Sequence, residues 1–384
     1  MRPGVGSDGR STELVDRVRR RLAVEPSGLE DAVRSEADGI VDDAVLAALR
    51  RDVDAELHGA GPLEPLLATP GVTDVLVNGP DAVWLDRGGG MERAAVRFTG
   101  EGAVRRLAQR LVAGAGARLD DALPYADAVL PDGTRVHAVL PPLAEHTTIS
   151  LRVLARRPHD LDGLVRLGAM SPVIADVLRA VVAARLAFVI SGGTGSGKTT
   201  LLGALLGTVP ADERMLLIED APELAVVHPH VVRLVARGAN VEGAGAVGLR
   251  ELVRQALRMR PDRLVVGEFR GAEMVELLVA LNTGHEGGAA TLHANSAADV
   301  PARFAALGAL AGLPGPAVTS LVASAIDIVV HLRRGRDARR TVAEIGLIAR
   351  AGNELVVEPA WSAASGEQPA AERLRRLLVH GPRG

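Results

Sequence analysis

The chain has 384 residues, enough for two or three domains that each bury a core of their own. Hydrophobic residues make up 47% of it and aromatic residues 2%, so we expect cores of alanine, valine, leucine and isoleucine. The net charge of −3 gives no basic footprint of the kind that nucleic acid or anionic lipid selects. The lack of cysteine excludes disulfides and cysteine-based zinc sites.

The first residues indicate a short disordered start followed by helices. Residues 1–10 are rich in glycine, and within residues 11–59 Ser27 and Glu30 have the spacing of a capping box. We find neither a signal peptide nor a run of about 20 apolar residues. We therefore expect residues 1–59 to be the helical N-terminal extension of a cytoplasmic protein that meets membranes only peripherally, through its partners.

Residues 60–156 are predicted to form a small α+β domain. Short β-rich runs are separated by turn residues, and one helix is expected near residues 101–115. The runs are TDVLVNG, AVWLDR, AAVRF, GTRVHAVL and TTISLRV. Residues 157–169 are predicted to be a linker.

From residue 170 to residue 360 apolar strands alternate with helices. The strands are LAFVISG, RMLLIED, HVVRLV, DRLVVGE, GAATLHA and IDIVVHL. This alternation predicts an α/β domain with a parallel sheet covered by helices on both faces. Residues 361–384 are predicted to be a polar tail with a short basic helix around residues 373–378.

The segment GGTGSGKT, residues 192–199, follows a predicted strand and opens a predicted helix, which is the setting of a Walker A phosphate loop. All but one of the 44 basic residues are arginine, and the exception is Lys198 in this loop. A slim ammonium group suits a loop that closes round a β- or γ-phosphate. No guanine-reading motif is present, which favours ATP. The predicted nucleotide contacts are Gly193, Thr194, Gly195, Ser196, Gly197, Lys198, Thr199 and Thr200.

Carboxylates follow two other predicted strands. Glu268 ends PDRLVVGE at a Walker B position, and Glu219 lies with Asp220 and Glu223 in LLIEDAPEL. A carboxylate at such a strand end can orient the attacking water or bind the shell of Mg²⁺. We expect Thr199 and Glu268 to hold Mg²⁺, partly through water. Either Glu219 or Glu268 is expected to activate the water.

The segment TGHEGGAATLHANS places His285 and His293 among glycines. Two histidines raise the question of a zinc site, but candidate third ligands such as Glu286 give no recognised spacing. A hydrogen-bonding sensor of the γ-phosphate is therefore the favoured interpretation.

The Walker A loop, the acidic segment IEDAPEL, the Walker B segment VVGE and the histidine segment occur in one chain in that order. This set resembles the secretion-system ATPase superfamily of type II and type IV machines. The segments GPLEPLL, VTDVLVNGP, DAVLPDGTRVHAVLPPLA, ISLRV and SAIDIVVHL resemble those of the Tad/Flp pilus-assembly branch. The resemblance covers about residues 45–350. It departs from the branch at Gly288, where many pilus-assembly members have a serine.

The resemblance implies a RecA-like P-loop motor domain and a smaller N-terminal domain that clamp ATP between them. It also implies a homohexameric ring that acts on inner-membrane platform proteins in pilus assembly or protein secretion. Arg135 and Arg152 match the N-terminal arginines of the family, as candidates to neutralise phosphate charge. The catalytic residues that the resemblance and the motifs indicate are Lys198, Glu219, Glu268 and His293.

Two other functions stay open at this stage. A RecA-like nucleic-acid translocase shares the phosphate loop, but the negative charge and the shortage of aromatic residues offer no stacking platform for bases. We therefore expect no nucleic-acid partner. A nucleotide-gated scaffold is the second alternative, and it binds ATP with little turnover.

Overall fold

The computed structural model describes residues 17–18, 21, 29–36, 59–153, 159–238, 244–335 and 337–381. Within the N-terminal extension it contains helix α2 (Leu29–Glu36), and Ser27 of the predicted capping box lies outside the described residues. The chain separates into two compact units, Met1–Leu154 and Ala155–Gly384. No helix in the described ranges is long and apolar enough to span a membrane.

The N-terminal unit contains a six-stranded antiparallel sheet in the order β3-β2-β1-β6-β5-β4. Its strands are β1 (Asp74–Val77), β2 (Val83–Asp86), β3 (Met91–Arg93), β4 (Tyr125–Val129), β5 (Arg135–Val139) and β6 (Thr148–Arg152). Besides α2, the helical segments in its described residues include η1 (Gly61–Leu63), α4 (Glu64–Leu67) and α5 (Glu101–Gly114). Val104, Leu107 and Leu111 recur at helical spacing on α5, and they are buried in one cluster with Val136 and Leu151 of the sheet.

The strand predictions for this unit hold for four of the five β-rich runs and are wrong for AAVRF, residues 94–98. Strand β3 lies just before that run, and its residues are all exposed. Strand β4 is absent from the prediction because Ala126, Asp127 and Ala128 have low β-propensity. Pairing with β5 holds this segment as a strand.

The C-terminal unit contains a nine-stranded mixed sheet in the order β15-β14-β13-β12-β7-β11-β10-β8-β9. Its parallel strands are β7 (Phe188–Gly192), β8 (Met215–Glu219), β9 (Val231–Val235), β10 (Arg263–Val266), β11 (Ala289–His293) and β12 (Ile328–Arg334). Its antiparallel strands are β13 (Arg340–Ala351), β14 (Glu354–Ser362) and β15 (Gly366–Glu367). The predicted parallel sheet is thus present, and an antiparallel extension that the sequence analysis missed continues it.

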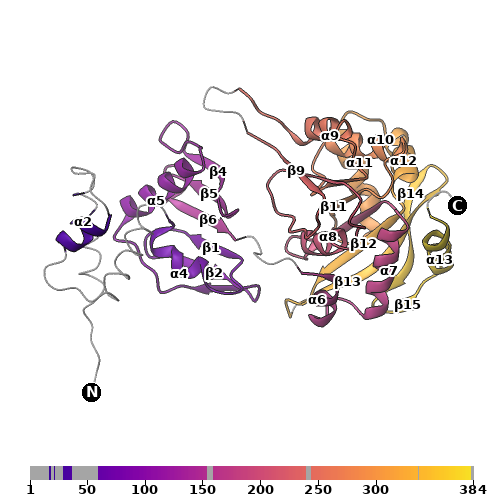
Figure 1. The fold of residues 1–384 in the computed structure, drawn as a ribbon, viewed down its shortest axis with the longest axis horizontal. Helices are drawn as coiled ribbons and strands as arrows, with labels where there is room; N and C mark the ends of the chain where they lie inside the picture. The colour runs from indigo at the N-terminus through magenta and orange to yellow at the C-terminus, as the bar shows by residue number, and fades with distance from the viewer. Residues whose placement is uncertain are drawn as a thin grey trace, which may run out of the picture. The chain divides into compact units, whose positions relative to one another are not determined.

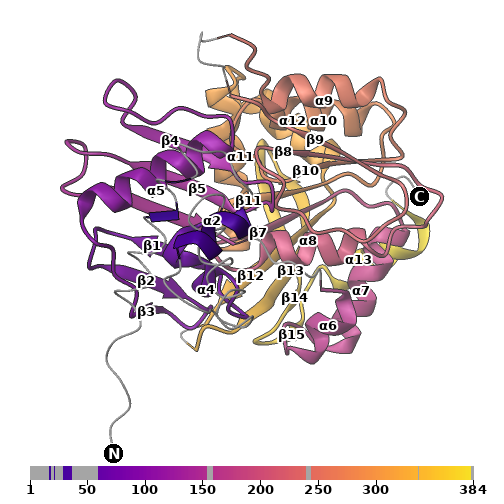
Figure 2. The ribbon, with the colours of Figure 1, turned by 60° about the vertical axis from the view of Figure 1, so that its left-hand side comes forward.

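Helices cover both faces of this sheet (Figures 1 and 2). One face carries α6 (Leu161–Arg166), α7 (Pro172–Ala183), α8 (Lys198–Leu206) and α13 (Ala371–His380). The other carries α9 (Leu249–Leu257), α10 (Glu273–Asn282), η2 (Ala297–Asp299), α11 (Val300–Leu310) and α12 (Gly315–Ala325). Neighbouring residues of β7 alternate between the two cores, because Phe188 and Ile190 join the first and Val189 joins the second.

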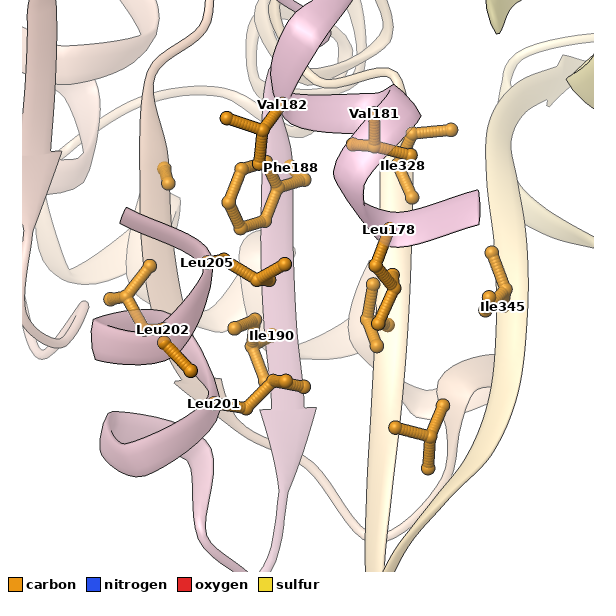
Figure 3. Packing of buried hydrophobic residues seen from close by; sticks show 14 of the residues in the cluster. Leu178, Val181, Val182, Phe188, Ile190, Leu201, Leu202, Leu205, Ile328 and Ile345 are labelled. Carbon is orange, nitrogen blue, oxygen red and sulfur yellow. The ribbon is translucent and has the colours of Figure 1, made fainter. Parts of the chain in front are cut away.

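Figure 3 shows α7 and α8 packed on the sheet around β7. Phe188 lies against Val182 of α7, and Ile190 lies beside Leu201 and Leu205 of α8. The residues labelled in the figure are at most 2% exposed. This packing fixes the end of β7 relative to the start of α8, where the phosphate loop is predicted.

Two segments outside the predicted motor domain contribute to its core. The predicted linker, residues 157–169, contains α6, whose Leu161 and Leu164 are buried in the first core. The predicted polar tail, residues 361–384, contains α13, whose Leu374 is buried in the same core. The C-terminal unit therefore extends beyond the predicted domain at both ends.

Candidate nucleotide-binding site

The predicted phosphate loop lies between a strand and a helix, as its sequence requires. Strand β7 ends at Gly192 and α8 begins at Lys198. Gly192 has a φ of 155°, and a Cβ built on it would lie 2.6 Å from the carbonyl oxygen of Leu332. Gly197 precedes α8 in the left-handed region, with a φ of 95°. The loop therefore depends on glycine at both of these positions.

Lys198 is 7% exposed, and its ammonium group contacts its own loop. The Nζ atom donates hydrogen bonds to the carbonyl oxygens of Gly192 at 3.0 Å and Gly193 at 2.9 Å. It also donates to Nδ1 of His293 at 3.4 Å. Burial lowers the pKa of Lys198, although the negative charge of Glu268 opposes the shift.

His293, which contacts Lys198, also contacts a carboxylate that follows the neighbouring strand. Nε2 of His293, at the end of β11, lies 2.6 Å from Oε1 of Glu268. Arg270 approaches Oε2 of Glu268 with Nε and Nη2, each at 2.5 Å, and its Nη1 lies 3.5 Å from Asp220. We call the connected residues Lys198, His293, Glu268 and Arg270 the site row.

The hydrogen bonds of the site row assign the proton on the ring of His293. A protonated lysine only donates, so Nδ1 of His293 accepts from Lys198, and Nε2 carries the proton that is donated to Glu268. Burial lowers the pKa of His293, and the charges of Lys198 and Arg270 lower it further against the effect of Glu268. The lowered pKa favours the neutral ring, in agreement with its hydrogen bonds.

Glu219, at the end of β8, is 3% exposed and binds the turn that follows it. Its Oε1 accepts hydrogen bonds from the backbone N–H groups of Glu223 at 2.8 Å and Leu224 at 2.7 Å. Its Oε2 lies 3.4 Å from Nη1 of Arg233 on β9. Burial raises the pKa of Glu219, and the N–H group of Leu224 and the charge of Arg233 oppose the shift. Oε1 is therefore held by the backbone of this turn, whereas Oε2 is near Arg233 but has no hydrogen-bond partner among the described residues.

The order of the strands brings these residues together. Strands β7, β11, β10 and β8 are parallel neighbours in that order, so their carboxyl ends lie at one edge of the sheet. That edge presents the phosphate loop, His293, Glu268 and Glu219. Thr199, which is partly exposed, and Thr200, which is exposed, follow Lys198 in the first turn of α8.

Three residues of the sequence prediction do not belong to the strand ends that form this edge. Arg135 on β5 and Arg152 on β6 are cross-strand partners in the N-terminal unit, and Nε of Arg152 donates to Asp74 at 3.0 Å. His285 precedes β11, at the opposite end of that strand from the site row. Its backbone nitrogen and its Nδ1 each lie 3.3 Å from the carbonyl oxygen of Ala280. His285 is therefore separated from the site row by the length of β11.

Close packing explains why glycine occupies position 288. A Cβ built on Gly288 would lie 2.5 Å from Cδ2 of Leu281 and 3.0 Å from the carbonyl oxygen of Leu264. One built on Gly287 would lie 2.1 Å from Nη1 of Arg263. The pair lets the start of β11 lie close to α10 and β10. A side-chain hydroxyl at position 288 has no room, and the position is remote from the site row.

The sequence analysis does not identify three arginines of the site edge. Arg270 binds Glu268, Arg233 faces Glu219, and Nε of Arg303 donates to the carbonyl oxygen of His293 at 3.0 Å. A signal exists for Arg270, because it lies two residues after Glu268 in GEFR. Arginine is so frequent in this chain that the other two carry no distinguishing pattern.

The residues at this edge fit a nucleotide and Mg²⁺. Ser196 is 2% exposed, and its hydroxyl has no hydrogen-bond partner within the described part of the chain. Buried hydroxyls are normally paired, and a phosphate oxygen in the loop would accept from this one. Thr199 and Glu268 offer the oxygen donors that Mg²⁺ takes beside nucleotide phosphates. Among the described residues no group of three or more histidine, aspartate or glutamate side chains could hold a metal by itself.

A family model described as "Type II/IV secretion system protein" matches residues 56–376. The chain belongs to this family. Membership confirms the superfamily that the motifs resemble, and it makes the protein an ATPase of that family. The candidate site thus lies in the RecA-like unit of a type II/IV secretion ATPase.

Relatives of this family member carry names from conjugation and type IV secretion. A protein of Mycobacterium tuberculosis strain H37Rv, provisionally named conjugal transfer protein Rv3659c, is 54% identical over 344 residues, covering 88% of this chain and 97% of that protein. The type IV secretion system protein VirB11 of Brucella suis biovar 1 is 31% identical over 332 residues, covering 78% and 90%. Neither is named for a Tad/Flp pilus.

A solved structure shares the fold. The crystal structure of the pilus retraction motor PilT with bound ADP matches this chain with a TM-score of 0.52 and 19% sequence identity. The match covers 80% of this chain and 82% of that one. The likeness confirms the predicted α/β architecture, in which an N-terminal sheet domain precedes a RecA-like unit.

Proposed function

We propose that this secretion ATPase is a hexameric motor that hydrolyses ATP to drive an inner-membrane machine. The site row, which joins the Walker A lysine Lys198 through His293 to Glu268, is the observation that supports this most strongly. The names of the relatives make conjugal transfer and type IV secretion the first candidates for the machine. A Tad/Flp pilus remains a narrower candidate that rests on motif resemblance. The ring, the platform proteins and a position at the inner face of the membrane rest on family resemblance.

Lys198 is proposed to bind the β- and γ-phosphates of ATP. Its ammonium group would exchange the carbonyl oxygens of Gly192 and Gly193 for phosphate oxygens, while backbone N–H groups of the loop bind the same phosphates. His293 contacts both Lys198 and Glu268, so its ring can relay the position of the lysine to the carboxylate. The row thereby couples phosphate binding to Glu268.

Glu268 is the better candidate to orient the attacking water. Glu219 accepts two backbone hydrogen bonds, and freeing its carboxylate would disrupt the turn that follows β8. Glu268 is held by side chains, those of His293 and Arg270, which can move without a change in the backbone. The sequence leaves Glu219 and Glu268 as equal candidates for water activation. We assign this role to Glu268.

Thr199 and Glu268 are proposed to hold Mg²⁺, with Glu268 acting partly through water. When bound, Mg²⁺ supplies positive charge that neutralises the phosphate oxygens. Arg135 and Arg152 remain proposed as cations that the N-terminal unit contributes to the nucleotide. This proposal rests on their match to the N-terminal arginines of the family, and in the structure Arg152 pairs with Asp74 at 3.0 Å.

The first test is phosphate release from Mg-ATP over a range of protein concentrations. We expect Lys198→Ala and Glu268→Gln each to lower the rate by about 100-fold or more, because one removes a phosphate contact and the other the water-orienting carboxylate. Glu354→Gln, at an exposed position that begins β14, is the matched control and should retain the rate. Specific activity should rise with concentration as rings assemble. Wild-type hydrolysis by Glu268→Gln would overturn the role assigned to this residue.

The same assay separates the alternatives. Activity that is indifferent to single-stranded DNA supports the secretion motor, whereas strong stimulation by DNA favours a nucleic-acid translocase. Tight binding of ATP with negligible turnover at every concentration favours a nucleotide-gated scaffold.

A further inference from the structure

Two arginines outside the predicted site contact the phosphate loop. Arg334 ends β12 and Arg340 begins β13, and the two are cross-strand partners. Nε of Arg340 donates to the carbonyl oxygen of Gly195 at 2.9 Å. Cδ of Arg340 lies 3.4 Å from where a Cβ on Gly197 would be, and Nη1 of Arg334 lies 3.4 Å from where one on Gly195 would be. Both side chains therefore reach the middle of the loop.

Strand pairing explains why the arginines lie there. Strand β12 is the parallel neighbour of β7 and pairs Leu332 with Gly192, so Arg334 lies two residues beyond the end of β7. Side chains alternate along a strand, and Arg333 belongs to the opposite face, where its charge acts on His331. The β12–β13 hairpin thus presents Arg334 and Arg340, and not Arg333, to the loop.

The β12–β13 hairpin concentrates positive charge beside the loop. Like charges directly opposite each other on paired strands are destabilising, and the surrounding sequence RRGRDARR adds further positive charge. Asp337 is the carboxylate of that turn, and its Oδ1 accepts a hydrogen bond from the backbone N–H of Arg339 at 3.2 Å. An anion held beside Arg334 and Arg340 would be attracted by the charge of both guanidinium groups. Both side chains are exposed and so accessible to a ligand.

We propose that Arg334 and Arg340 are a further part of the nucleotide site and bind the phosphates of a nucleoside diphosphate or triphosphate from the side of the β12–β13 hairpin. Ser196, with its buried and unpaired hydroxyl among the described residues, lies between the two glycines that these arginines approach. The forked guanidinium group matches phosphate oxygens with two parallel donors. This inference rests on the proposed function and adds two phosphate-binding residues from the C-terminal hairpin.

Calorimetric titration of the full-length chain with ADP, AMP and adenosine in the presence of Mg²⁺ tests the proposal. The proteins are the wild type, the double variant Arg334→Gln/Arg340→Gln, and the matched control Arg333→Gln, which removes one charge from the same hairpin. We expect the double variant to bind ADP about tenfold or more weakly, because hydrogen bonds to a charged ligand are lost. The loss should be smaller for AMP, and the control should stay within about twofold of wild type.

The outcomes separate the inference from the proposed function. A double variant that binds ADP as tightly as Arg333→Gln overturns the inference and leaves the ATPase assignment intact. An equal loss for ADP and adenosine also overturns it, because the arginines would then only shape the loop. Arg340→Lys keeps the positive charge and should bind ADP more tightly than the double variant does. If the double variant does not fold, Arg340→Lys and the single variant Arg334→Gln are measured in its place. Failure of the wild type to bind ADP would instead refute the proposed function.

Discussion

His331 on β12 is a buried polar side chain in the C-terminal unit, and its ring contacts two other segments of that unit. It is 6% exposed, and its Nδ1 lies 3.0 Å from the hydroxyl of Ser191, the last residue before Gly192. The backbone of Asn295 hydrogen-bonds to the same ring. A neutral imidazole can accept at one nitrogen and donate at the other, so it satisfies both contacts. The ring thus connects the strand of the phosphate loop with the segment that follows β11.

Stability should therefore depend on pH through His331. Burial lowers its pKa, although Asn295 and Asp299 oppose the shift. On acidification the unfolded chain takes up this proton first, so unfolding becomes more favourable as the pH falls below about 6.5. We expect the Tm of the wild type to fall more steeply between about pH 7.5 and pH 5.5 than that of His331→Gln. Circular dichroism measures both slopes.

The control for this prediction is His380→Gln, at an exposed position on α13, which should keep the wild-type slope. Equal slopes for the wild type and His331→Gln would show that the proton on His331 does not contribute to the pH dependence of unfolding.

The sequence identifies site residues where one residue type is required at a fixed place. Lys198 stands out because a phosphate loop needs its ammonium group, and Glu268 because it ends a buried strand. Arg334, Arg340 and His331 carry no such signal. Their importance depends on the pairing of β12 with β7 and β13, which brings residues about 140 positions apart in the chain into contact.

At the scale of elements, a strand can be predicted from the sequence when its residues form a continuous apolar run. Five of the six parallel strands, β7, β8, β10, β11 and β12, are mainly apolar runs with residues buried in both cores, so their sequences indicate them. The sixth, β9, lies at the edge of the sheet and is only partly buried, and its run of valine and leucine indicates it. Strand β13 mixes arginine, glutamate and glycine with its apolar residues, and this pattern hides it although Ile345, Leu347 and Ile348 are buried. The pairing with β12 and β14 holds β13 in the sheet.

The close packing of the start of β11 against α10 and β10 leads to a prediction about stability. Gly288→Ala would place a Cβ 2.5 Å from Leu281 of α10 and 3.0 Å from the carbonyl oxygen of Leu264 on β10. The backbone of β10 cannot give way easily, so we expect a loss of about 1–3 kcal/mol in the free energy of unfolding. Urea denaturation measures it. Gly248→Ala, where a Cβ meets nothing within 4 Å, should change this free energy by less than about 1 kcal/mol.

Comparable destabilisation by both glycine variants would mean that crowding at β11 is not the cause. A stable Gly288→Ala protein would instead show that α10 moves to make room for a larger residue at position 288.

At the scale of the whole molecule, the sequence predicts two folded parts but not the order of strands within them. Consecutive strands of a parallel sheet can be arranged in several ways, and short apolar runs do not record which strands are neighbours. Here β11 lies between β7 and β10, and this arrangement places His293 between Lys198 and Glu268. The site row therefore follows from topology as much as from its motifs.

Each unit encloses its own apolar clusters. The buried residues of one cluster all lie within residues 59–153, and those of the other two lie within residues 159–381, with none in common. A unit with its own core can fold by itself. We therefore expect the fragments 59–153 and 159–381, expressed separately, each to unfold cooperatively in urea, as followed by far-ultraviolet circular dichroism.

The same independence should appear in the full-length chain. Leu140 and Leu178 are fully buried, one in each unit, and truncation of either to alanine should cost about 2–5 kcal/mol. Because the cores share no residue, Leu140→Ala should lower only the transition of the N-terminal unit, and Leu178→Ala only that of the C-terminal unit. Hydrogen exchange of backbone amides, resolved by peptide, assigns each transition to its unit. If either substitution accelerated exchange equally in both units, the two would unfold as one cooperative body, and the separate cores would not set the limits of cooperativity.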